Sequence, residues 1–117
     1  MSDIYTIDFE PSKLSHRLEE LGLEFADLDT AVELMKKEEK MIIAELTLYF
    51  SKNGGYKNIT ELNGYIYSDT KFKDYFDRYE RTLKQRNRAK IRYDSYKIFV
   101  DNLRTKIVNE RTLTKNL

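Results

Sequence analysis

The 117-residue chain has no cysteine and no tryptophan, and it has only one proline and four glycines. The absence of cysteine excludes disulfides, thiolate zinc sites and cysteine nucleophiles, and it fits a reducing compartment. The longest uninterrupted apolar run, Met41 to Ala44, is far too short to span a bilayer. Because the first ten residues, MSDIYTIDFE, carry acid where a signal peptide needs base, we expect a cytoplasmic protein.

Signals for catalysis and metal binding are equally scarce. His16 is the single histidine, so no second imidazole or thiol completes a metal site, and we expect it at the surface. Gly54-Gly55 lacks the Lys-Ser/Thr of a phosphate loop and favours a turn. We therefore predict a protein that is not an enzyme and that uses no metal or cofactor.

Charge is abundant and unevenly distributed along the chain. Residues 1–50 hold five basic and twelve acidic residues, whereas the remaining residues hold sixteen basic and eight acidic ones. The formal net charge of +1 therefore hides an acidic first part and a basic second part. The two parts can pair inside the chain or head-to-tail between subunits, or the basic part can bind a polyanion.

Apolar spacing predicts an all-α fold in a single domain, residues 1–117. Residues 1–26 are predicted to form an extended arm, Ile4 to Phe9, and a short helix that Gly22 ends. The first long helix is predicted over 27–51, before the turn residues Asn53 to Gly55. Its seam keeps a strict four-three spacing through Leu28, Val32, Met35, Glu39, Ile42, Leu46 and Tyr49.

A connector is predicted over 52–69, with one helical turn followed by a short extended piece. Asp69 is a good N-cap for the second long helix, predicted over 70–110, and a tail follows over 111–117. Helical spacing places in the core the rings of Phe72, Phe76, Tyr79, Tyr93 and Phe99. The resulting architecture is a long helical hairpin with a short N-terminal helix.

We also expect a ring-like homo-oligomer. A second helix of roughly 60 Å facing a first helix of roughly 36 Å leaves apolar surface without an intramolecular partner. The predicted interface residues comprise the first-helix seam, three later apolar residues and two cations: Leu28, Val32, Met35, Glu39, Ile42, Leu46, Tyr49, Val100, Leu103, Ile107, Arg86 and Lys90.

The segment Lys84 to Arg92 rises above this background, because five of its nine side chains are cationic and no acid occurs between Glu80 and Asp94. At about 100° per residue, one face of a helix carries a set of residues here called the cationic stripe: Arg81, Lys84, Arg88 and Arg92. Such a stripe can follow a phosphate backbone. The alternative, a merely solubilising face, normally mixes charge signs.

Arg86 and Lys90 fall on the apolar side of the same helix and interrupt its seam. Glu39 is the one acid on the facing seam. We therefore expect a buried or interfacial ion pair that fixes the register of the two helices.

Aromatic residues in the connector suggest base stacking. Tyr56, Tyr65 and Tyr67 lie among Lys52, Lys57, Lys71 and Lys73. Nucleobases of single strands stack on aromatic faces with little sequence preference. These residues are therefore candidates for holding a strand; the alternative is that the rings cover the end of the hairpin as core.

Several short stretches resemble the phage UvsY family of recombination mediators. They are Leu48-Tyr49-Phe50-Ser51, Leu62-Asn63 with Tyr67-Ser68-Asp69, Tyr93-Asp94, Phe99-Val100-Asp101, and Leu103, Asn109 and Arg111. The resemblance covers about 36–117. It implies a helical protein that self-assembles into a ring, binds single-stranded DNA, and helps a RecA-like recombinase replace a single-strand-binding protein.

The chain departs from the family pattern before the aromatic-Ser step. Family members tend to carry basic residues there, where this chain has Ile43, Ala44, Glu45 and Leu46. DNA contacts are therefore predicted only from the connector and the second helix. The competing interpretation is a helical protein-interaction module, such as a phage inhibitor or an assembly adaptor.

Overall fold

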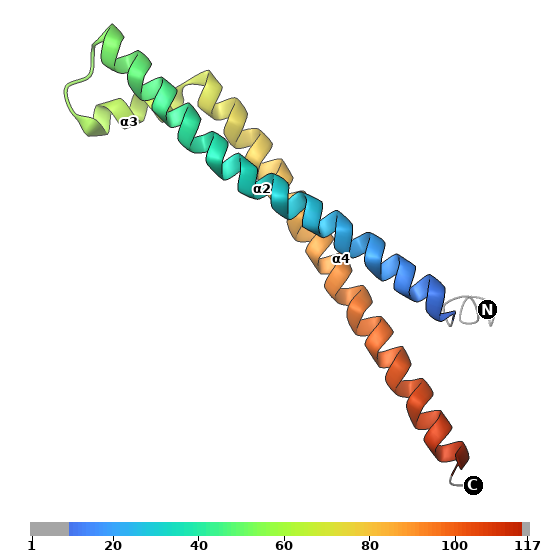
Figure 1. Cartoon of the computed structure of the whole chain (residues 1–117). Helices are drawn as coiled ribbons and strands as arrows, with labels where there is room; N and C mark the ends of the chain where they lie inside the picture. The colour runs from blue at the N-terminus through green and yellow to red at the C-terminus, as the bar shows by residue number, and fades with distance from the viewer. Residues whose placement is uncertain (1–9, 116–117) are drawn as a thin grey trace. The chain divides into compact units, whose positions relative to one another are not determined.

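The computed structural model describes residues 10–115, which form a long helical hairpin (Figure 1). Within this range the helices are α2 (Pro11–Asn53), α3 (Ile59–Ser68) and α4 (Thr70–Lys115), and no residue of the range lies in a strand. The predicted all-α class and helical hairpin are therefore confirmed. The predicted N-terminal arm lies outside the described residues.

Helix α2 corrects the prediction of a separate short helix. It begins at Pro11, whose missing N–H is harmless in a first turn, and it continues through Gly22 for 43 residues. A Cβ at Gly22 would lie 3.3 Å from the Tyr93 ring. Glycine is therefore placed here by close packing against an aromatic ring, and it does not end the helix.

The end of α2 lies two residues beyond the predicted one, at Asn53 and not at residue 51, and the predicted turn glycines follow it directly. Gly54 adopts φ 69°, a left-handed conformation that favours glycine, and its N–H donates to the Phe50 carbonyl at 3.1 Å. The side-chain amide of Asn53 donates to the Tyr49 carbonyl at 2.8 Å. These contacts satisfy carbonyl groups that the last turn would otherwise leave free.

The connector was predicted to contain one helical turn and an extended piece, and this is wrong. Ten residues form α3, and the Asn58 side chain caps it by accepting from the Glu61 N–H at 2.9 Å. Residues Tyr65 to Tyr67 belong to this helix, and Ile66, only 2% exposed, packs from it into the core.

Helix α4 begins where its N-cap was predicted. The Asp69 carboxylate accepts from the Lys71 N–H at 2.9 Å. The helix then runs for 46 residues to Lys115, beyond the predicted end at 110 and into the predicted tail. Because α2 has 43 residues, the two long helices are nearly equal in length, and the prediction of a much longer second helix is wrong.

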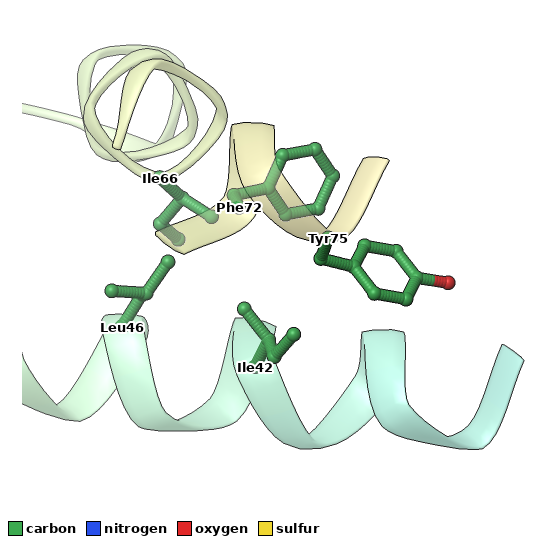
Figure 2. Close-up of a cluster of buried hydrophobic side chains, with 5 residues drawn as sticks. All are labelled: Ile42, Leu46, Ile66, Phe72 and Tyr75. Carbon is green, nitrogen blue, oxygen red and sulfur yellow. The ribbon is translucent and has the colours of Figure 1, made fainter. Parts of the chain in front are cut away.

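The chain divides into two compact units, and residues 28–86 form one of them. Its core brings together Ile42 and Leu46 of α2, Ile66 of α3, and Phe72 and Tyr75 of α4 (Figure 2). All five side chains are at most 8% exposed. Figure 2 shows the Tyr75 hydroxyl directed away from the other four side chains, at the margin of the cluster.

The hydroxyl of Tyr75 donates to the Met35 carbonyl at 2.6 Å, although the ring is only 1% exposed. Burial, reinforced by the negative charge of Glu39, raises the pKa of Tyr75 to about 12 from its ordinary 10.0. The folded chain therefore holds this proton more tightly than the unfolded chain.

This difference predicts an alkaline loss of stability. The contribution of Tyr75 is fully present below pH 10 and is lost between pH 10 and about 12, with a total of about 2–3 kcal/mol for the two-unit shift. Urea unfolding across that range should give a steeper decline for the native chain than for Tyr75→Phe. Parallel declines in the two proteins would contradict the assignment.

The second unit comprises the residues up to 27 and those from 87 onward. Leu14 and Leu21 of α2 and Ala89 and Val100 of α4 are buried in it. The Tyr93 ring lies against the backbone at Gly22. The two helices of this unit thus pack closely at small residues, Gly22 on α2 and Ala89 on α4.

Candidate nucleic-acid interface

Salt bridges beside the apolar seam fix several basic side chains of α4 to acids of α2. In the unit 28–86, Arg78 contacts Glu38 at 2.8 Å, and Lys71 contacts Glu45. Seven residues separate the two acids and seven separate the two bases, as an antiparallel register requires. The Glu38 hydrogen bond raises the pKa of Arg78. These cations are neutralised within the chain.

Arg86 lies in the seam as predicted, but its partner is Asp29 and not Glu39. The guanidinium Nε lies 3.5 Å from Asp29 Oδ1, and the Arg86 side chain is 24% exposed. The antiparallel register places Asp29 opposite Arg86 and brings Glu39 near Tyr75. The prediction of an ion pair at Arg86 is therefore confirmed, but the predicted partner Glu39 is wrong.

Lys90 was predicted to share the seam with Arg86, and this is wrong. Lys90 is exposed, whereas its neighbour Ala89 is 1% exposed. The four-three spacing that passes through Arg86 continues to Ala89 and then to Tyr93, so it bypasses Lys90. Tyr49, predicted as an interface residue, is likewise exposed at 57%. Other predicted interface residues, including Ile42, Leu46 and Val100, are buried within the chain itself.

Three members of the cationic stripe are exposed and lack a carboxylate partner among residues 10–113. Lys84 and Arg88 make no ion pair in this range, and Arg81 donates only to the backbone carbonyl of Asp77, at 3.4 Å. Their spacing places them on the face of α4 away from its seam. The cations of α4 therefore divide into paired ones beside the seam and unpaired ones on the outer face.

Arg92 is the exception within the stripe. Its guanidinium donates to Glu24 at 2.6 Å, and both side chains are about half exposed. Among the four residues, Arg92 lies closest to the seam side of the helix, within reach of α2. An anion at this position has to share the guanidinium with Glu24.

The three connector tyrosines differ in how far they are buried, and two of them pack on neighbouring rings while staying partly exposed. Tyr65 stacks on Phe50 with ring centroids 5.6 Å apart, and its hydroxyl donates to Glu61, which raises its pKa. Tyr67 packs edge-on against Phe72 at 4.9 Å. Yet Tyr65 is 42% and Tyr67 52% exposed, whereas Tyr56 is half-buried. Two of the three predicted stacking residues thus present ring surface.

The connector lysines also differ among themselves. Lys71 is paired with Glu45, so an anion at this position has to share its ammonium group. The ammonium groups of Lys57 and Lys73 are exposed and make no ion pair in the described part of the chain. Lys57 and Lys73 therefore keep free positive charge near the connector, as does the exposed Lys52 at the end of α2.

Two rings that helical spacing assigned to the core are instead exposed. Phe76 is 44% and Phe99 43% exposed. The buried positions of α4 include Phe72, Tyr75, Ala89 and Val100, and these two phenylalanines fall outside that repeat. The buried repeat runs Phe72, Tyr75 and the half-buried Tyr79, whereas counting four residues from Phe72 gives Phe76, so spacing alone did not decide the phase.

No protein-family model, curated protein or solved structure that was compared with the chain matches it. Over the residues that the structure describes, no helix is both long and apolar enough to cross a membrane. The same residues contain no cluster of three or more metal-ligating side chains. His16 is exposed, as predicted, and contacts Glu20 at 2.8 Å.

Proposed function

We propose that the chain is a single-stranded DNA-binding accessory protein of phage recombination and repair, which helps to load a RecA-like recombinase. The observation that carries the proposal is the set of exposed, unpaired cations Arg81, Lys84 and Arg88 on one face of α4. Acids of α2 neutralise the cations beside the seam, while these three stay free. Cations held free in this way suit a polyanionic ligand.

The preference for single strands rests on the exposed aromatic rings. Tyr65 and Tyr67 present ring surface at the same end of the hairpin as the free lysines Lys57 and Lys73. Stacked bases inside a duplex cannot reach such rings, whereas unpaired bases can. The mechanism in this proposal is binding alone, and it needs no cofactor or catalytic group.

Self-assembly is part of the proposal and has a candidate surface in the unit 28–86. Leu34, Met41 and Leu48 recur every seven residues on α2 and are 58%, 64% and 58% exposed. An apolar row of this kind on a helix typically packs against another helix. Several weak DNA contacts joined in one homo-oligomer would hold an extended strand through raised effective concentration.

The recombinase, the single-strand-binding protein that it replaces, and the host cytoplasm as location enter the proposal through the resemblance to UvsY proteins. The free cations and exposed rings support the DNA-binding part. The second candidate function is a helical protein-interaction module, and the apolar row Leu34, Met41 and Leu48 is the observation that favours it.

Fluorescence anisotropy with single- and double-stranded oligonucleotides tests the proposal. We expect micromolar or tighter binding to single strands at low salt, weaker binding to duplexes, and a log-linear decline as salt rises. Light scattering on the same samples reports the assembly state. A folded oligomer that binds no single strand at low salt would reject the mediator and favour the interaction module.

A further inference from the structure

A hollow of about 420 Å³ opens on the unit that holds residues up to 27 and from 87 onward. Leu21, Ile91, Tyr96 and Phe99 form its apolar lining. Arg17 and Arg92 also line it, and each is paired with an acid of α2, Arg17 with Glu20 at 3.4 Å and Arg92 with Glu24 at 2.6 Å. Its volume falls in the range of small-molecule pockets. The hollow shares only Arg92 with the surfaces described above.

Much of the apolar lining is uncovered. Leu21 is only 4% exposed, whereas Ile91 is 64% and Phe99 43% exposed. The Tyr96 and Phe99 rings have centroids 5.8 Å apart and are tilted by 41°, so they present two differently oriented aromatic surfaces. Uncovered apolar surface flanked by positive charge suits a ligand that is flat and apolar at one end and anionic at the other.

The hollow continues the cationic stripe along α4. Arg88, Arg92, Ser95 and Phe99 follow one another at spacings of four, three and four, so they share one helix face. Arg88 carries unpaired charge one turn before Arg92. A strand whose phosphates follow the stripe therefore reaches the hollow without leaving this face.

We propose that the hollow receives one nucleobase of the bound single strand, with Phe99 and Ile91 in contact with the base, the unpaired Arg88 facing the adjoining phosphate, and Arg92 shared between that phosphate and Glu24. This inference rests on the proposed function and assigns base contact to residues outside the connector. A nucleotide combines a flat apolar ring with an adjacent anion, and the hollow offers a matching surface for each.

The first test compares a normal single strand with an abasic strand of the same length and charge. Binding of the abasic strand reports the phosphate contacts alone. We expect the normal strand to bind at least about fivefold tighter, since stacking on protein rings contributes about that much or more per base. Equal affinities would overturn the base site, and loss of both would overturn the proposed function itself.

Matched variants then locate the base. Phe99→Ala and Ile91→Ala should lower the preference for the normal strand severalfold and reduce the fluorescence change of 2-aminopurine placed in it. Phe76→Ala and Ile98→Ala are the controls, because their side chains are similarly exposed, at 44% and 60%, and do not line the hollow. An unchanged preference in Phe99→Ala and Ile91→Ala, or the same loss in the controls, would overturn the assignment.

Discussion

Replacing both Lys84 and Arg88 by glutamate is expected to lower the affinity for single-stranded DNA by about a hundredfold at low salt, or about tenfold for each reversed charge. Neither side chain makes an ion pair among the described residues, so the change removes no contact that holds the helices together. The plot of log affinity against log salt should become shallower by about 0.7 for each phosphate contact removed. Anisotropy over a salt series measures both effects.

The matched control is Lys37→Glu with Lys40→Glu. These lysines of α2 are exposed and unpaired within the described residues, so the control changes the net charge by the same amount on the other long helix. We expect it to keep most of the binding. Equal losses in the two double variants would mean that overall charge and not the stripe governs binding, and full binding by the first would reject the stripe.

Arg92 is left out of that design because the structure gives it a partner. Reversing it would place a glutamate beside Glu24 and disturb the packing of α4 on α2, so a loss of binding would have two explanations. The sequence placed Arg92 on the correct helix face. It could not show the ion pair, because that depends on how α2 and α4 align.

Local signals predicted the parts of the fold that depend on neighbouring residues. The turn residues around Gly54 end α2, where Gly54 has a positive φ, and Asp69 caps α4, both through interactions within a few positions. The prediction that Gly22 ends a helix is wrong because the contact that favours glycine there is with Tyr93, which is distant in sequence. Glycine costs about 1 kcal/mol in a helix interior, yet here it allows the Tyr93 ring to lie against the backbone.

In the candidate site, too, features that depend on one helix were predicted and features that depend on two helices were not. Periodicity was enough to find the exposed cations Lys84 and Arg88, because exposure on a helix follows from the phase of its seam. The hollow at Ile91 and Phe99 was missed, since it also needs Arg17 and Leu21 from α2. A surface built by two helices can be identified only when their register is known, and the sequence left the register of α2 against α4 undetermined.

The second large expected effect is a loss of stability when Ile66 of α3 is truncated, because Ile66 is the one buried side chain of this helix. Ile66 is 2% exposed and packs with Ile42, Leu46, Phe72 and Tyr75. Ile66→Ala should lower the free energy of unfolding by about 2–5 kcal/mol, through lost burial and the cavity left behind. A loss of that size is a large fraction of the stability of a small domain.

Ile59→Ala is the matched control on the same helix, since Ile59 is 73% exposed and its truncation should change stability by less than about 0.5 kcal/mol. Thermal melts followed by circular dichroism measure both variants. The comparison also bears on function, because Tyr65 and Tyr67 are the neighbours of Ile66 on α3 and depend on its anchorage for their position. If Ile66→Ala melts like Ile59→Ala, then α3 is not held by this contact, and the position of the two tyrosines depends on their ring contacts with Phe50 and Phe72 alone.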